Sequence, residues 1–354
     1  MRVAVLFNEV PPDATADAAD VQVQVEAVAA ALGHLGHEPI PCGCTIDLAA
    51  ARAELEHIRP DLVFNLVESL GGTDRNMHLA AQMLETLGLP FTGSPADAIG
   101  ASSDKVRAKR LLIETGLATP PAATADEVLG EPAFPGRFIL KPIFEHASLS
   151  IEDDAVVEAA DLAGLRSALR RREQSVARPL FAEQFIAGRE LNASLFADHG
   201  NPRVLPIAEI DFSGFPPDKP QIVGYAAKWL DDSFEYTQTP RRFEFAPSDQ
   251  KMLHQVSARA IETWHLFKLR GYARVDFRVD PSGTPWILEA NANPCLSQDA
   301  GFAAAVERAG WTFDVAMARI VEDAMQSPAA GCSVRGSILR PAVEPALSAT
   351  GERK

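Results

Sequence analysis

The chain has little cysteine and no long hydrophobic run. Its four cysteines, Cys42, Cys44, Cys295 and Cys332, follow neither a disulfide framework nor the paired spacing of a zinc site. No apolar run approaches the ~20 residues that a membrane-spanning helix needs, and the apolar start, residues 1–7, is too short for the core of a signal peptide. We therefore expect a cytoplasmic protein without a membrane partner, because unpaired cysteines are typical of a reducing compartment.

Basic residues are also scarce. Lysine and arginine number 33 against 48 aspartates and glutamates, which gives a net charge of −15 and no basic stripe. This balance argues against nucleic acid as a partner, and any site for an anionic nucleotide has to create its positive field locally. Only 8 residues are lysines, so those in apolar or motif-like settings stand out: Lys105, Lys141 and Lys228.

Two nucleotide-binding fingerprints are absent. Residues 8–20, after the first predicted strand, lack the G-x-G-x-x-G pattern of dinucleotide-binding folds, and no G-x-x-x-x-G-K-[ST] loop occurs anywhere. The second absence excludes a P-loop NTPase. At 354 residues, 47% hydrophobic and 23% charged, the chain has an ordinary soluble composition and enough length for two or three domains.

The first 100 residues alternate between strand and helix patterns. Strands that alternate with helices at this spacing are typical of a parallel α/β layer. The predicted strands are residues 2–7, 38–42 and 61–67, and the predicted helices are residues 20–36, 48–58 and 76–87.

The pattern beyond residue 100 is mixed. One helix is predicted to open at residues 101–105, and a long helix is predicted over residues 247–269 with Ser248 as its N-cap. The other predicted strands are residues 137–142, 179–186, 189–196 and 203–212, and the last helices are residues 298–309 and 312–326.

Residues 271–294, GYARVDFRVDPSGTPWILEANANP, carry the most informative pattern of the chain. Apolar and polar residues alternate over 274–279, which is typical of a strand with one apolar face. A turn cluster follows at 280–283, and residues 284–292 resemble a second strand. The segment therefore predicts a β-hairpin.

Three oxygen-bearing side chains of this hairpin are predicted to converge. A turn centred near Ser282 places Asp276 opposite Glu289, and Asn291 shares the strand face of Glu289. Two carboxylates and an amide oxygen inside apolar strands suit Mg²⁺ or Mn²⁺ better than zinc. Arg274 beside them could hold a phosphate or a developing oxyanion. On spacing alone, a surface hairpin whose acids are only solvated explains the pattern equally well.

These segments resemble a known family. A strand with R-x-D followed by L-E-A-N-x-x-P is similar to the metal-binding end of the ATP-grasp fold, and the continuation into Asn293-Pro294 resembles its D-alanine–D-alanine ligase branch. The segments VFNLVESLGG and LETLGLPFTGS resemble the N-terminal domain of the same family. The resemblance covers residues 1–325.

The resemblance implies an ATP-grasp fold, in which a parallel α/β domain precedes two α+β subdomains that clamp the nucleotide. On this basis we expect the N-terminal α/β domain at residues 1–100, the lid subdomain at 101–187 and the metal-binding subdomain at 188–326. Residues 327–354 lack clear periodicity and are expected to form a flexible tail.

The resemblance also assigns residues to the nucleotide. Its phosphate-binding lysines correspond to Lys105, Lys141 and Lys228, although a lysine at the end of a strand more often extends to water. Carboxylates and backbone groups around residues 183–190 are expected to contact adenine and ribose. On the residues alone, this segment could be an ordinary hairpin connection with exposed acids. These adenine and ribose residues are Glu183, Gln184, Ile186 and Glu190.

The loop after Lys141 departs from the family pattern. His146 and Ser150 occupy positions that are glycine in the resembled ligases. Ala147 replaces a serine, whereas Ser148 remains and is assigned to catalysis. We expect a stiffer loop, because residues other than glycine have fewer left-handed conformations. His146 could contact phosphate or substrate, or be incidental.

The substrate positions depart as well. Glu68-Ser69 stands where the ligases have a histidine-glycine pair. Trp229 replaces a tyrosine, whose hydrogen bond to the lid is expected to be lost or rearranged. Cys295 and Ala300 replace a glycine and a carboxylate-binding serine. We interpret Cys295 as a small packed residue and not a nucleophile, because no base pattern accompanies it.

The sequence therefore predicts an enzyme that joins a carboxylate to an amine. It is expected to use ATP and Mg²⁺ (or Mn²⁺), to form an acyl phosphate and to release ADP and phosphate, with Arg274, Lys228 and Ser148 as catalytic residues. Amino acids or small peptides are the expected substrates, and the family leads us to expect a homodimer. Two alternatives stay open: a genuine D-alanine–D-alanine ligase with a remodelled pocket, and a non-catalytic ATP-binding regulatory protein.

Overall fold

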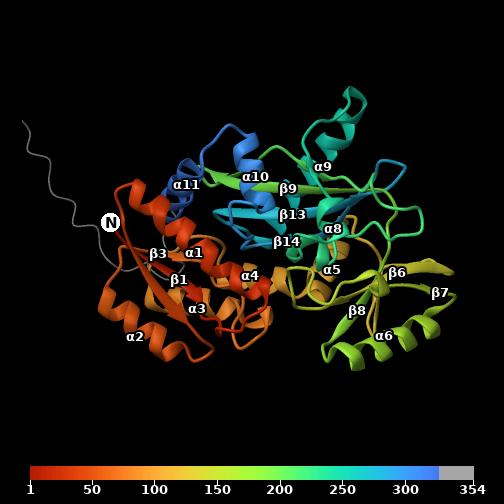
Figure 1. The fold of residues 1–354 in the computed structure, drawn as a ribbon, viewed down its shortest axis with the longest axis horizontal. Helices are drawn as coiled ribbons and strands as arrows, with labels where there is room; N and C mark the ends of the chain where they lie inside the picture. Colours follow the sequence, from red (N-terminus) through yellow and green to blue (C-terminus); the bar gives the residue numbers. More distant parts are fainter. Residues whose placement is uncertain (327–354) are drawn as a thin grey trace, which may run out of the picture.

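The computed structural model describes residues 1–326, and the predicted tail, residues 327–354, lies outside the described part. The described chain forms three β-sheets with helices packed around them (Figure 1). The sheets follow one another along the chain, from red and orange through yellow and green to blue. No helix among residues 1–326 combines the length and the hydropathy of a membrane span.

The N-terminal sheet is parallel, with strand order β2-β1-β3. Its elements are β1 (Arg2–Asn8), α1 (Ala16–His34), β2 (Glu38–Cys44), α2 (Leu48–Ile58), β3 (Leu62–Asn65), a 3-10 turn (Asp74–Asn76) and α3 (His78–Leu87). Val3 and Val5 pack on one face against α1, whereas Ala4 and Leu6 pack on the other face with α2 and α3. Since both faces are covered, β1 is a continuous apolar run.

The middle sheet is antiparallel, with strand order β5-β4-β8-β6-β7. Its elements are β4 (Ala122–Ala123), β5 (Val128–Leu129), β6 (Gly136–Pro142), a 3-10 turn (Asp153–Ala155), β7 (Val156–Ala159), α6 (Leu162–Val176) and β8 (Leu180–Gln184). Phe138 and Leu140 of β6 pack with Leu165 of α6. Because side chains alternate along a strand, Ile139 and Lys141 lie on the opposite face, which borders the cavity described below.

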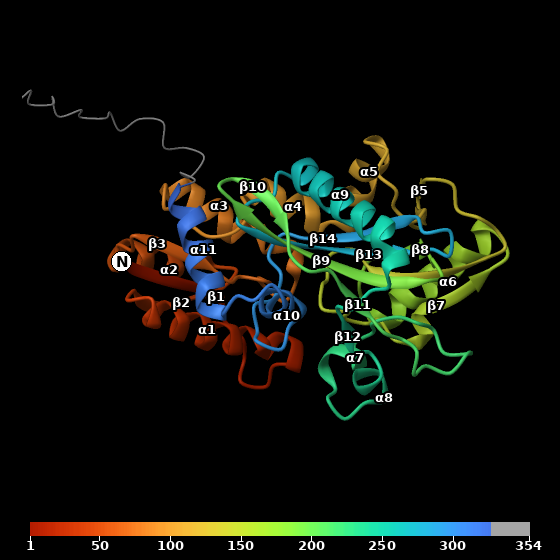
Figure 2. The same ribbon diagram turned by 90° about the horizontal axis from the view of Figure 1, so that it is seen from above.

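The last sheet is also antiparallel, in the order β12-β11-β9-β13-β14, with β10 paired to β9. Its elements are β9 (Arg189–Asp198), β10 (Asn201–Val204), β11 (Ala208–Ile210), α7 (Ala226–Trp229), α8 (Phe234–Thr237), β12 (Arg241–Arg242), α9 (Gln250–Phe267), β13 (Tyr272–Val279), β14 (Pro285–Asn291) and α10 (Gly301–Arg308). The helix α9 packs on β9, β13 and β14, and α7 and α8 stand out from the sheet (Figure 2). A parallel layer followed by antiparallel sheets with helices is the predicted architecture.

The predicted hairpin is formed by β13 and β14, and its register is confirmed. Asp276 pairs with Glu289, and Arg274 pairs with Asn291. A β-bulge follows, because Phe277 pairs with Ile287. Bulges redirect side chains near functional sites, and this one follows directly after the pair of Asp276 and Glu289.

The last helix, α11 (Phe313–Gln326), returns to the first sheet. Its buried residues Met317 and Ile320 join Val3, Val5 and Phe64 in one hydrophobic cluster. Both views show α11 beside the N-terminal strands (Figures 1 and 2). The C-terminal end of the described chain therefore completes the core of the N-terminal layer.

The helix predicted to open at residues 101–105 is confirmed, but the helix that ends there was not predicted. These residues join two helices, α4 (Ala96–Ser103) and α5 (Lys105–Glu114). Asp104 has an extended backbone, and its carboxylate accepts a hydrogen bond from the N–H of Arg107 at 2.9 Å. An aspartate N-cap thus ends one helix and begins the next.

Two further boundaries differ from the prediction. The strand expected over residues 203–212 is two strands, β10 and β11, with Pro206 between them, and proline has no N–H for a sheet ladder. The helix expected from residue 247 starts with a 3-10 turn at Pro247–Asp249, so Ser248 is not its N-cap. Asp249 instead accepts a hydrogen bond from the N–H of Ala246 at 3.3 Å.

Candidate active site

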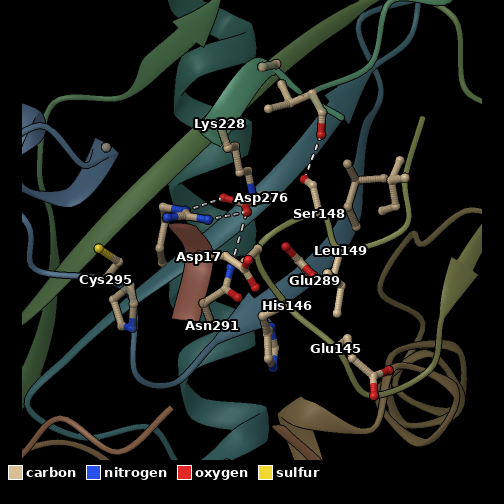
Figure 3. A pocket seen from close by; sticks show the side chains of 18 of the residues that line it. Asp17, Glu145, His146, Ser148, Leu149, Lys228, Asp276, Glu289, Asn291 and Cys295 are labelled. Atoms are coloured by element: carbon tan, nitrogen blue, oxygen red, sulfur yellow. Dashed lines mark hydrogen bonds and ion pairs between the residues drawn. The ribbon is translucent and has the colours of Figure 1, made fainter. Parts of the chain in front are cut away.

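A cavity of about 710 Å³ lies where the three sheets meet. Its walls come from the start of the chain, the loop after β6, and the strands β9, β13 and β14 (Figure 3). All the residues that the sequence assigned to catalysis, nucleotide or metal line this one cavity. They are Lys105, Lys141, Ser148, Glu183, Gln184, Ile186, Glu190, Lys228, Arg274, Asp276, Glu289 and Asn291.

Asp276 accepts four hydrogen bonds at the polar end of the hairpin. Arg274 binds it with two parallel hydrogen bonds, from Nε to Oδ1 at 2.8 Å and from Nη2 to Oδ2 at 2.9 Å. The Nδ2 groups of Asn192 and Asn291 donate to the same carboxylate at 2.8 and 3.2 Å. Figure 3 shows Lys228, Glu289 and Asn291 around Asp276. This network fixes the polar end of the hairpin in one orientation.

Glu289 faces the lysines. Lys105 Nζ lies 3.8 Å from its Oε2 and donates to the carbonyl oxygen of Glu145 at 2.6 Å. Burial raises the pKa of Glu289, but the nearby lysines, Lys105 foremost, outweigh this effect and hold that pKa well below its ordinary range. Burial lowers the pKa of Lys228, whose ammonium has no hydrogen-bond or ion-pair partner among residues 1–326. The ionised acid and the free ammonium leave this part of the cavity ready for a charged ligand.

Glu183 lies between two lysines. Its carboxylate is 2.5 Å from Lys141 Nζ and 2.6 Å from Lys109 Nζ. Burial raises the pKa of Glu183, but these two ammonium groups reverse the effect and keep it below the ordinary value. The sequence analysis missed Lys109, which is 1% exposed. Its spacing of four residues from Lys105 on one helix could have revealed it.

Arg278 organises the opposite wall of the cavity. Its guanidinium donates to the carbonyl oxygen of Ile186 at 2.9 Å, to that of Gln221 at 3.0 Å and to Glu190 at 3.2 Å. Burial raises the pKa of Glu190, and Arg278 opposes this rise. The sequence analysis did not assign Arg278 to the site, because it only continues the alternation of β13.

The loop after β6 is anchored to the N-terminal layer. The backbone N–H of His146 donates to Asp74 at 2.7 Å, and Thr73 donates to Glu145 at 3.3 Å. Arg178 holds the same Glu145 carboxylate at 2.9 Å. Burial lowers the pKa of His146 to about 3, so its ring is neutral near pH 7. His146 therefore supplies no positive charge for a phosphate.

The comparisons with known proteins agree with this geometry. A sequence profile described as "D-ala D-ala ligase C-terminus" matches residues 125–322. The D-alanine–D-alanine ligase of Moorella thermoacetica is 31% identical over 316 residues, which are 85% of this chain and 93% of that protein. The chain belongs to the D-alanine–D-alanine ligase family.

Other family relatives and a solved structure extend the match. The D-alanine–D-alanine ligase of Bordetella petrii is 30% identical over 78% of this chain and 81% of its own length. The uncharacterised protein y4sG of Sinorhizobium fredii is 30% identical over 81% and 83%. The crystal structure of the Bacillus anthracis D-alanine–D-alanine ligase complexed with ATP shares the fold, with a TM-score of 0.66 at 21% identity, over 92% of this chain and 98% of that one. The predicted family, the ATP-grasp fold and the class of ATP-dependent carbon–nitrogen ligases are confirmed.

The lid loop of this family member takes left-handed conformations without glycine. Ala147, Ser148 and Ser150 have φ of 58°, 59° and 60°. Such conformations cost an ordinary residue about 1–2 kcal/mol each, so the surrounding contacts must hold them. Ser148 Oγ donates to the carbonyl oxygen of Val223 at 2.7 Å, and the indole Nε1 of Trp229 donates to that of Ala147 at 2.9 Å. The sequence analysis expected the hydrogen bond from position 229 to the lid to be lost or rearranged. It is rearranged, because the indole N–H of Trp229 now makes it.

The end of the cavity around Glu68 and Cys295, where the sequence analysis expects the substrate, is acidic. Cys295 Sγ and Ser297 Oγ donate to Asp20 at 3.1 and 2.7 Å. Burial, and then Glu68 and Asp20, raise the pKa of Cys295 well above its ordinary value, so the thiol is protonated and poorly suited to nucleophilic attack. Burial also raises the pKa of Glu68 to about 8. In Figure 3, Cys295 lies on the far side of Asp276 from Glu145, away from the lid.

Proposed function

We propose that the protein is an ATP-dependent ligase that phosphorylates the carboxylate of an amino acid or small peptide and joins it to an amine, with release of ADP and phosphate. The convergence of three lysines with Arg274 and the acidic hairpin in one cavity carries this proposal. Lysines surround the place where an ATP γ-phosphate would meet a carboxylate, and anionic groups need such local positive charge in a chain of net charge −15.

The nucleotide would lie between the middle and last sheets. Lys105, at the start of α5, and Lys141, on β6, both line the cavity. Lys228 joins them from α7. Gln184, Ile186 and the two acids Glu183 and Glu190 would hold adenine and ribose. This assignment is supported by their common position on one wall of the cavity.

The residues present fit Mg²⁺. Asp276 and Glu289 carry carboxylate oxygens and Asn291 an amide oxygen, which hard divalent cations prefer, and all three line the cavity. Only two of these three donors are carboxylates, and among residues 1–326 no group of three or more His, Cys, Asp or Glu side chains is placed to hold a metal. When bound, the cation would supply charge neutralisation for the phosphate oxygens.

The side chains of this chain would perform three tasks. Lys105, Lys141 and Lys228 hold the phosphates in line with the carboxylate. Arg274, oriented by its bidentate pair with Asp276, stabilises the oxyanion that forms when the amine attacks the acyl phosphate. The lid, with Ser148 on it, excludes water that would hydrolyse that intermediate.

The substrates are proposed to be amino acids or small peptides, and D-alanine is a second candidate. The relatives named D-alanine–D-alanine ligase favour D-alanine. The acids at the substrate end and the protonated Cys295 favour a different selectivity, because they replace residues of the usual pocket. The proposal includes a cytoplasmic setting, a homodimer and no nucleic-acid or membrane partner, as the composition and the family suggest.

Phosphate release from Mg-ATP tests the function. Purified protein is screened against pairs of D- and L-amino acids and dipeptides, with Glu289→Gln as the inactive control. We expect release that needs one acid and one amine and that is lost in Glu289→Gln. ATP binding without stimulation by any pair would contradict the ligase proposal for these substrates and favour a non-catalytic ATP-binding protein.

A further inference from the structure

We propose that Lys219 is a positioning residue that ties together two segments that border the cavity, the lid loop (residues 143–152) and α8, and so keeps water away from the acyl phosphate until the amine attacks it. This inference rests on the proposed ligase function. Lys219 lies in the loop between β11 and α7, to which no function was assigned from the sequence.

Lys219 bridges two carboxylates from distant parts of the chain. Its Nζ lies 2.5 Å from Oδ2 of Asp153, in the 3-10 turn that follows the lid loop, and 2.7 Å from Oε1 of Glu235 on α8. The ammonium also lies 5.6 Å from the centre of the Phe215 ring, within the range of a cation–π contact. Only 14% of the Lys219 side chain is exposed, so these three groups hold it in one place.

Asp153 is attached to the middle sheet. The next residue, Asp154, forms an ion pair with Arg172 of α6 at 2.8 Å, and the same arginine donates to the carbonyl oxygen of Ser150 in the lid loop at 3.0 Å. Since α6 packs on β7 and β8, these contacts fix the end of the lid loop to the middle sheet. Ile151, between them, lines the cavity.

Glu235 is attached to the other side of the cavity. It lies on α8, which packs against α7 (Figure 2), and the next residue, Tyr236, lines the cavity. The ring of Phe234 on α8 lies 5.5 Å from the ring of Phe215, the same ring that the ammonium of Lys219 approaches. Lys219 does not line the cavity, so it acts through the two segments that it joins.

The charge of Lys219 decides whether these two segments attract or repel each other. Burial raises the pKa of Glu152, and the carboxylates of Asp153, Asp154 and Glu235 raise it further, whereas Lys219 lowers it. The hydrogen bond from Lys219 is the main reason why the pKa of Glu235 lies below its ordinary value. Because Asp153 and Glu235 contact the same nitrogen atom, they would face each other without it, and like charges at that separation repel.

A junction that opens would admit water to the acyl phosphate. Water would then take the acyl group in place of the amine, which regenerates the acid and releases phosphate, so ATP is hydrolysed without formation of an amide. Loss of Lys219 should therefore weaken nucleotide binding and uncouple phosphate release from amide formation.

Nucleotide affinity tests the bridge first. Calorimetry on the full-length protein measures the Kd of a non-hydrolysable ATP analogue with Mg²⁺. Lys219→Met should raise this Kd by about threefold to tenfold, because partly exposed ion pairs contribute modestly, and Lys219→Arg should restore most of the affinity because it keeps the charge. Arg52→Met is the matched control, since Arg52 pairs with Glu56 within α2 at 3.0 Å and does not line the cavity. This variant should bind as the wild type does.

A double-mutant cycle distinguishes a bridge from a general loss of stability. Glu235→Gln should weaken binding of the analogue in the wild-type background, where it removes an attraction. It should not weaken binding further in the Lys219→Met background, where it removes a repulsion. Equal Kd values for the wild type and Lys219→Met, or losses that add in the double variant, would overturn the inference.

Coupling of the reaction is the second readout. With an acid and an amine that support phosphate release, the wild type should form an amide for each phosphate released. Lys219→Met should release phosphate in excess of amide, and Lys219→Arg should restore the equality. An unchanged ratio in Lys219→Met would refute the protective role. If no pair supports phosphate release, the ligase proposal fails separately, and the calorimetric cycle still decides on Lys219 because it needs no turnover.

Discussion

Lys109 and Glu183 form a fully buried ion pair beneath the cavity, with exposed side-chain fractions of 1% and 2%. Lys109 also donates to Thr119 Oγ1 at 2.8 Å and to the carbonyl oxygen of Pro120 at 3.0 Å. It does not line the cavity, whereas Glu183 and Lys141 do. Lys109 therefore holds Glu183 in place from the side that faces away from the cavity.

Replacing Lys109 should destabilise the fold strongly. Lys109→Met leaves a buried carboxylate with one partner fewer, and breaking a buried pair costs about 3–5 kcal/mol. The measurement is the urea midpoint of unfolding. Arg110→Met on the same helix is the control, because its pair with Glu127 is exposed (47% and 39%) and contributes less than about 1 kcal/mol. Equal midpoints for the two variants would contradict this account.

Glu68 should make stability depend on pH. Burial raises its pKa to about 8, against 4.5 for the ordinary group. Between these values the folded protein retains a proton that the unfolded chain has lost, so this contribution to the free energy of unfolding falls as pH rises from about 4.5 to about 8. Glu68→Gln should therefore lose less stability than the wild type between about pH 5 and about pH 8 in urea unfolding. Glu26→Gln, a change at an exposed position of α1, should lose as much stability as the wild type over this pH range. If Glu68→Gln also loses as much as the wild type, Glu68 is not the group responsible.

At the scale of elements, one indole of α7 is among the contacts that hold the lid. Trp229 on α7 holds the carbonyl oxygen of Ala147 at 2.9 Å, where the backbone is left-handed. A single hydrogen bond contributes about 0.5–1.5 kcal/mol. Trp229→Phe keeps an aromatic side chain, smaller than the indole, and removes this bond, so we expect a non-hydrolysable ATP analogue to bind about twofold to tenfold more weakly by calorimetry.

Trp286→Phe is the control for the lid. Its Nε1 donates to Asp280 at 2.9 Å in the hairpin turn, and it does not line the cavity. Nucleotide affinity should stay at the wild-type value in this variant. An equal loss in both variants would show that the Trp229 contact has no special role in closing the lid.

The acidic hairpin could be predicted from sequence because its signals are local. Alternation and a turn cluster set the pairing of Asp276 with Glu289. The resemblance supplied the cavity lysines. Lys109 and Lys219 were missed, because one lies on an ordinary amphipathic helix and the other in a loop whose ion pairs join segments far apart in the chain. Such tertiary pairing leaves no local pattern.

The end of α4 was missed because two helices meet there without a linker. Ser102 and Ser103 resemble N-cap residues, but they end α4, since their hydroxyls bond back to the carbonyl oxygen of Ile99 at 3.1 and 2.8 Å. Serine competes for backbone groups at either end of a helix. Composition alone could not decide between these two uses.

At the scale of the molecule, the two ends of the described chain share a core. The domain boundaries at residues 100, 187 and 326 stay predictions, but α11 covers the face of β1 that carries Val3 and Val5. Met317→Ala should therefore cost about 2–5 kcal/mol of unfolding free energy, because its side chain is fully buried in that core. Met325→Ala, 46% exposed on the same helix, should change it by less than about 0.5 kcal/mol. Similar urea midpoints for both would contradict the shared core.

The most direct test of the account follows an oxygen atom. The acid substrate that supports phosphate release is labelled with ¹⁸O in its carboxylate and incubated with its amine partner and Mg-ATP. An acyl phosphate transfers one carboxylate oxygen to phosphate when the amine displaces it, so mass spectrometry should find one ¹⁸O in each phosphate released. Phosphate without label, or label in AMP, would contradict the proposed reaction.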